Sequence, residues 1–247
     1  MVNKYVDINP DGDTLIILPF IKAANKAGDI AHNRHSLSNN DDSLEVEPSL
    51  FVSDDQEEGE DNIKSQEVYY FKVSMKHLLL AFSRAKALLQ GPFRESIPTA
   101  DGLRHWKFDP IFDPEAFKII ISIIHAKSNN VPEQVSLEML SEIAVIVNDL
   151  NCQDSVTIFT RFWLKALDSI ITPLNRTTAF SDDGIYFARL IFIFSVFKLG
   201  MKFTIATHNA VLYSPSISSS FGLPIPPQIL AKNVYLCCRK QKSFNAL

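Results

Sequence analysis

The chain has 247 residues, enough for one medium-sized domain with an extension, and 46% of them are hydrophobic. Its formal net charge of −4 excludes an overall basic footprint for nucleic acid, and no apolar run reaches the roughly 20 residues that a membrane span needs. The 18 phenylalanines predict a largely aromatic core. We therefore expect no membrane association and no direct binding of nucleic acid.

Cysteine usage and the N-terminus indicate an intracellular protein. Cys152, Cys237 and Cys238 form no CxxC pair and no even disulfide framework. The first residues hold no apolar signal segment. We expect a location in the cytoplasm, the nucleus or both.

Two strands are expected in the first third of the chain, separated by a long insertion. After the turn signal Asp11-Gly12-Asp13, residues Thr14–Leu18 have the pattern of a buried strand, and Val68–Val73 have that of a second. Residues 21–66 lack periodicity, and Asp41–Asp61 contain ten acidic residues and no Lys or Arg. This pattern predicts a disordered acidic insertion across which the strands pair. The acidic run is either simply solvated or a separate partner site.

The next elements are two short helices and a third strand. Ser74 is expected to cap a helix over residues 75–82, and a second helix, Arg84–Gln90, stops at Gly91-Pro92. The segment Arg104–Phe108 alternates polar and apolar residues, as a half-buried strand does.

Three helices with clear boundary signals follow. Asp113-Pro114 starts a helix that ends near His125, where a cation suits the helix dipole. Ser136 caps a helix that ends at Asn151-Cys152. The helix after it is expected to bury one face, formed by Val156, Phe159, Phe162, Trp163, Ala166 and Leu167. Such consecutive helices predict an antiparallel stack against a small sheet.

The last third is expected to be a helical extension. Asp182 or Asp183 caps an apolar helix over Ile185–Leu199, and a further helix covers Met201–Tyr213. A short helix, Gln228–Arg239, precedes a basic tail.

The order of these elements and four of the segments resemble the BTB/POZ family, especially its fungal members. The segments are DGDTLIIL, VSMKHLLLAFSRAKALLQGPFRES, RHWKFD with DPEAFKIIISIIHA, and VPEQVSLEMLSEIAVIVNDLNCQDSVTIFTRFWLKAL, within Asp7–Phe20 and Val68–Leu167. The resemblance implies an α+β fold, with a small three-stranded sheet flanked by about five helices. It places this domain at residues 7–170, interrupted at 21–66, with the helical C-terminal extension at 171–247.

By analogy with that family, the chain is expected to be a non-catalytic protein–protein interaction module, a scaffold. Alternatives are a substrate adaptor of a cullin–RING ubiquitin ligase and a transcriptional co-regulator. Cullin-binding members carry a hydrophobic-x-acidic motif after the second helix, and the aligned Leu88-Leu89-Gln90 has Gln in place of the acid. These three residues and Phe93 are the expected partner-binding residues. Self-association is a further option, although dimerising members of the family often have a helix before the first strand, for which the dozen residues of mixed polarity here are a poor substitute.

No catalytic motif was found, so we expect no enzyme, no cofactor and no metal site. GxGxxG, GxxxxGK[ST], GxSxG and HExxH are all absent from the sequence. His32 and His35 lack the further ligands that a closed zinc site needs. Structural roles are expected for the remaining candidates, His77, His105, His125, His208, Cys152 and the Asp182-Asp183 pair.

Overall fold

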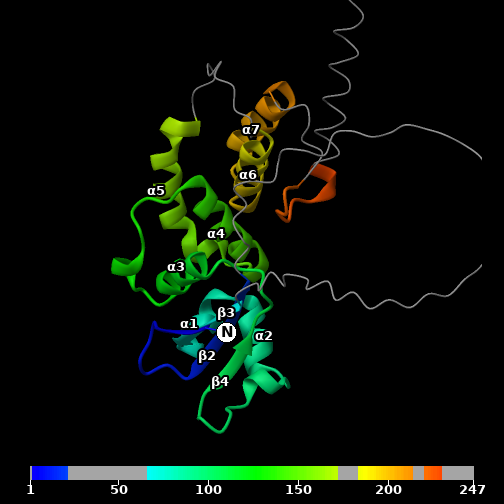
Figure 1. Cartoon of the computed structure of the whole chain (residues 1–247). Coiled ribbons are helices and arrows are strands. Elements are labelled where there is room, and N and C mark those ends of the chain that lie inside the picture. The colour runs from blue at the N-terminus through cyan, green and yellow to red at the C-terminus, as the bar shows by residue number, and fades with distance from the viewer. Residues whose placement is uncertain (1, 22–65, 172–182, 214–219, 230–247) are drawn as a thin grey trace, which may run out of the picture.

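The computed structural model describes residues 2–21, 66–171, 183–213 and 220–229. These residues form an α+β fold in which a small mixed sheet packs against helices, as the sequence predicted at this level. Figure 1 shows the sheet at one end of the molecule and the last two helices at the other. The acidic segment expected between the first strands, the sequence around His32 and His35, and the basic tail lie outside the described residues.

Four strands form the sheet in the order β1-β3-β2-β4. Their bounds are β1 (Val2–Asp7), β2 (Thr14–Ile21), β3 (Gln66–Val73) and β4 (Arg104–Lys107). β2 and β3 pair, as predicted, and the pairing is antiparallel, while β4 lies parallel to β2. Ile21 pairs with Gln66, so both ends of the expected insertion are strand residues and the strands are longer than predicted.

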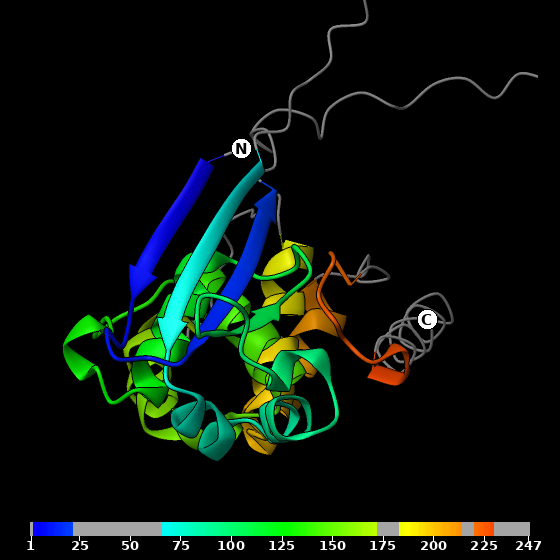
Figure 2. The same cartoon turned by 90° about the horizontal axis from the view of Figure 1, so that it is seen from below.

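The prediction of three strands was wrong, because β1 adds a fourth at the edge of the sheet (Figure 2). β1 pairs parallel to β3, and most of its side chains are exposed. Its side chains contact those of the neighbouring strand β3. The Tyr5 and Tyr70 rings stack with centroids 4.7 Å apart, and Lys4 Nζ lies 2.8 Å from Glu67 Oε2. A strand that buries so little shows no hydrophobic alternation, so its sequence did not indicate it.

Five helices form at nearly the predicted positions, two of them before β4 and three after it. They are α1 (Met75–Ala81), α2 (Ser83–Gln90), α3 (Pro114–Ile124), α4 (Leu137–Leu150) and α5 (Gln153–Ile171). Two predicted caps are confirmed, because Asp113 accepts a hydrogen bond from the Ala116 amide at 2.8 Å and Ser136 from the Met139 amide at 3.1 Å. Asn151, at φ 50°, ends α4 in the left-handed conformation.

The core between the sheet and α3 is aromatic, as the composition predicted. Phe71 of β3 packs against Phe117 of α3 with ring centroids 5.3 Å apart. The ring centroids of Trp106 in β4 and of Phe108 are 4.7 Å apart, and the Phe108 ring in turn packs against Phe112. These five side chains are almost completely buried. They hold the sheet against the central helix α3.

The predicted buried face of α5 was partly wrong. Val156 and Trp163 are buried, but Phe162 is 63% exposed and Ala166 is exposed too. Thr160 lies on the buried face instead, where its hydroxyl donates to the Val156 carbonyl at 3.0 Å. Local hydrogen bonding to the helix backbone explains how a polar side chain occupies this face.

Two further helices, α6 (Asp183–Val196) and α7 (Gly200–Tyr213), complete the described fold. α6 packs on α4 and contributes Leu190–Phe194 to the same hydrophobic core. It ends three residues earlier than predicted, and Lys198 adopts φ 55° in the turn that follows. Asp182 and most of the expected helix Gln228–Arg239 lie outside the described residues. No helix in the described ranges has the length and apolar character to cross a membrane.

Candidate protein-interaction surface

The four expected partner-binding residues lie where α2 passes into the 3-10 helix η1 (Arg94–Ser96). Leu89 is only 2% exposed and belongs to the core, while Leu88 is half-buried against it. Gln90 is exposed, and the Phe93 ring is 49% exposed. The structure therefore presents Gln90 and Phe93 together at the surface and turns Leu89 away from it.

Ile97, immediately after η1, extends this exposed region and was not among the predicted residues. Its side chain is 65% exposed. The same region carries two basic residues, Lys86 and Arg94, which are both exposed. We call this region the α2–η1 surface; its residues are Lys86, Gln90, Phe93, Arg94 and Ile97. An apolar residue in a short irregular segment has no periodicity that would indicate its exposure.

Gly91 allows the Phe93 ring to lie close to the end of α2. A Cβ atom at Gly91 would lie 2.9 Å from Cδ2 of Phe93 and would overlap the carbonyl oxygen of Ala87. The φ of Gly91 is −85°, so the position requires glycine for space and not for backbone conformation. This close approach packs Phe93 against the backbone and limits its freedom.

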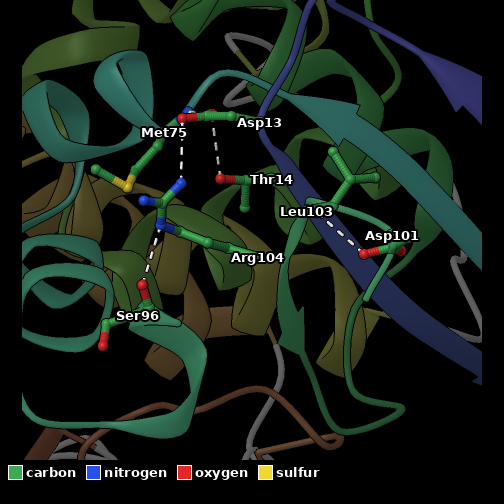
Figure 3. A network of polar contacts seen from close by, with 7 residues as sticks. All are labelled: Asp13, Thr14, Met75, Ser96, Asp101, Leu103 and Arg104. Atoms are coloured by element: carbon green, nitrogen blue, oxygen red, sulfur yellow. Dashed lines mark hydrogen bonds and ion pairs between the residues drawn. The ribbon is translucent and has the colours of Figure 1, made fainter. Parts of the chain in front are cut away.

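Arg104 on β4 ties η1 to the sheet (Figure 3). Its Nε donates a hydrogen bond of 3.1 Å to the Ser96 carbonyl, and its Nη1 lies 3.4 Å from Asp13 Oδ2. Asp13 Oδ1 accepts a 2.7 Å hydrogen bond from the Met75 amide at the start of α1. One arginine and one carboxylate thereby link the segment before β2, the helix α1 and η1.

A second polar cluster holds the turn between η1 and β4. The Asp101 carboxylate accepts hydrogen bonds from the Thr99 hydroxyl, from the Leu103 amide at 3.0 Å and from His105 Nε2 at 2.8 Å. These contacts, that of Thr99 first, lower the pKa of Asp101 to about 2. Gly102 takes φ 78° in this turn, where a Cβ would be strained.

The start of α1 differs from the prediction at Ser74. The Ser74 side chain makes no capping hydrogen bond, and Asp13 supplies the acceptor instead. The Ser74 amide donates to His125 Nε2 at 3.0 Å. Since Nε2 accepts, the proton of the neutral ring is on Nδ1, which donates to the Ile121 carbonyl at 2.9 Å.

His125 is therefore not the cation that its place at a helix end suggested. The residue is 6% exposed, and burial lowers the pKa of its imidazole. The His77 ring stacks on it with centroids 4.8 Å apart, and the positive charge of a protonated His77 would further disfavour the imidazolium. At this position the cost of burying a charged imidazole outweighs the stabilisation that the helix dipole would give a cation.

The other candidates for chemistry are dispersed over the described fold. Cys152 is buried, and this burial raises the pKa of its thiol to about 12, so the thiolate is scarce at neutral pH. His105 pairs with Asp101, and His208 is exposed on α7. Among the described residues, no three His, Cys, Asp or Glu side chains are grouped to hold a metal ion. Cys237 and Cys238 lie outside these residues.

A scan against protein-family models and a search of curated proteins both give no match for this chain.

Proposed function

We propose that this protein is a non-catalytic protein–protein interaction module of the BTB/POZ type, which binds a partner through the α2–η1 surface. The order of the elements supports the proposal. In chain order the elements β2, β3, α1, α2, β4, α3, α4 and α5 cover the segments on which the resemblance is based. The additional strand β1 lies at the sheet edge and leaves this order unchanged.

The observation that carries the proposal is the exposure of Phe93 and Ile97 on a segment that is held in place. Their side chains are 49% and 65% exposed, although the segment between them is tied to β4 through Ser96 and Arg104. Exposed aromatic and aliphatic side chains on a positioned segment are typical anchors of protein interfaces. Because the segment is already ordered, binding costs less conformational entropy.

A second candidate is the adaptor of a cullin–RING ubiquitin ligase. The exposure of Gln90 and Phe93 at the end of α2 favours it, because the family's cullin-binding motif follows this helix. The missing acid at Gln90 and the burial of Leu89 weigh against it. The third candidate, a transcriptional co-regulator, depends on the acidic run and the basic tail, which lie outside the described residues.

The experiment is affinity purification of the full chain from its native cells, followed by binding assays with the purified partners. The test variant carries Phe93→Asp and Ile97→Asp. A matched control carries Ile158→Asp and Phe162→Asp, which alter an equally exposed apolar pair on α5. We expect the test variant to lose partners that the control retains. Cullin and RING proteins among the lost partners would select the adaptor function.

Two results would contradict the proposal. The first is that purified partners bind the Phe93→Asp/Ile97→Asp variant as well as the wild type, while circular dichroism shows both to be folded. The second is enzymatic turnover by the purified chain that disappears when one His, Cys or Asp is replaced.

A further inference from the structure

The α2–η1 surface is basic as well as apolar. Its exposed basic residues are Lys86 of α2 and Arg94 of η1, whereas the one acidic residue between Ser83 and Ile97, Glu95, is only partly exposed. On α2, the exposed residues Ser83, Lys86, Ala87 and Gln90 recur at helical spacing and form one stripe. η1 packs against α2, and Arg94, its first residue, is exposed.

The two basic side chains of the surface have no acidic partner among the described residues. Arg84, on another side of α2, pairs with Asp149 at 2.9 Å. No such ion pair is formed by Lys86 or Arg94 within the described ranges, and both are exposed. Their charges are thus available to a ligand, on the same α2–η1 segment that exposes Phe93 and Ile97.

We propose that the partner presents an acidic peptide segment with at least one bulky apolar residue, which binds along α2 and η1. Its carboxylates pair with Lys86 and Arg94, and its apolar side chain contacts Phe93 and Ile97. The inference rests on the proposed function and specifies the chemistry of the partner. Charge complementarity determines which segments bind and how fast, while the apolar contact supplies most of the affinity.

A binding titration with the full chain tests the inference. The probe is a fluorescein-labelled synthetic peptide in which Glu residues flank a Leu-Phe pair, and binding is measured by fluorescence anisotropy at low and at high salt. One control peptide replaces every Glu by Gln, and a second replaces the Leu-Phe pair by two Ser. We expect only the acidic, apolar probe to bind, and we expect salt to weaken its binding.

Charge reversal at the surface locates the site. The Lys86→Glu/Arg94→Glu variant is expected to weaken probe binding by about tenfold or more. The matched control, Arg161→Glu/Lys165→Glu, makes the same change of net charge at exposed positions of α5 and is expected to leave the affinity near that of the wild type. All four residues are exposed, so both variants are expected to fold.

Three results would overturn the inference. They are absence of probe binding, an equal loss of affinity in both charge-reversal variants, and binding that appears only after residues 41–61 are deleted. The last result would identify the occupant as the chain's own acidic segment. If the probe fails but native partners still require Phe93 and Ile97, the proposed function stands and only the acidic chemistry is wrong. If those partners also bind without Phe93 and Ile97, both proposals fall.

Discussion

The Asp13 carboxylate accepts a 2.7 Å hydrogen bond from the backbone amide of Met75, so α1 is capped by a residue 62 positions earlier in the chain. The other oxygen of the same carboxylate lies 3.4 Å from Arg104 Nη1. Through Arg104 the contact extends to the Ser96 carbonyl in η1. The arrangement of the candidate interaction surface thus depends on one acid in the turn before β2.

The first prediction concerns this capping residue. Replacing Asp13 by Ala should lower the free energy of unfolding by about 1–2 kcal/mol, because the Met75 amide loses its acceptor. Asp13→Asn should lower it less, since an amide oxygen still accepts the hydrogen bond. Ser74→Ala is the control, because the Ser74 hydroxyl makes no cap, and it should be nearly neutral. Urea unfolding measures all three; a Ser74→Ala loss as large as that of Asp13→Ala would contradict the assignment.

The second prediction concerns the dependence of stability on pH. The pKa of His125 is lowered in the folded state, so below about pH 6.5 the unfolded chain binds more protons at this residue. The contribution of His125 to the free energy of unfolding should therefore fall as the pH is lowered from about 7 to about 5. A protonated His125 would also lose its hydrogen bond from the Ser74 amide. Urea unfolding at a series of pH values measures this slope.

Two variants isolate the contribution of His125. His125→Gln keeps an acceptor for the Ser74 amide but does not titrate, so its stability should depend less steeply on pH than that of the wild type. His208→Gln removes an exposed histidine on α7 and should keep the wild-type slope. An unchanged slope in His125→Gln would show that other groups cause the effect.

The third prediction compares two adjacent aromatic residues of α5. Trp163 is 1% exposed and donates from Nε1 to the Pro132 carbonyl at 2.8 Å, whereas Phe162 is 63% exposed. Trp163→Ala should cost about 3–5 kcal/mol, and Phe162→Ala less than about 0.5 kcal/mol. Thermal and urea unfolding give both values. Similar losses in the two variants would mean that Phe162 is buried.

The fourth prediction concerns Gly91. Gly91→Ala should destabilise the fold by about 1–3 kcal/mol, because the added Cβ would overlap the Ala87 carbonyl oxygen. It should also weaken partner binding, because the Phe93 ring must move. Gly200→Ala is the matched control, because Gly200 is the first residue of α7 and a Cβ atom there would meet no other atom within 4 Å. Its stability should be unchanged or higher, and a Gly91→Ala protein as stable as this control would refute the argument.

Local signals in the sequence predicted most of the elements. The Asp113 and Ser136 caps, the breaks at Gly91 and Asn151, and the pairing of β2 with β3 all depend on residues close in sequence or on a clear apolar pattern. Where such signals were weak, the prediction failed. β1 was missed because its side chains are mostly exposed, and Phe162 was misplaced because the buried face of α5 includes the polar Thr160, which an apolar pattern leaves out.

The candidate surface was predicted only in part, for a related reason. A family resemblance predicted Leu88, Leu89, Gln90 and Phe93 as partner-binding residues, but a resemblance does not indicate which of them are exposed. Leu89 is buried because α2 turns that side toward the core, and Ile97 is exposed because η1 is held against β4. Both facts depend on the packing of α2 and η1 against other elements.

The sequence by itself determined the α+β class, the aromatic core and the positions of most helices, because helical periodicity and capping act over a few residues. Only the tertiary structure decided that Asp13 caps α1, that His125 is neutral, and that Phe93 and Ile97 are exposed on a segment held against β4. Each of these depends on groups distant in sequence that meet through packing. Hydrogen bonds and desolvation depend on which groups are close in space, and a local sequence pattern does not contain that information.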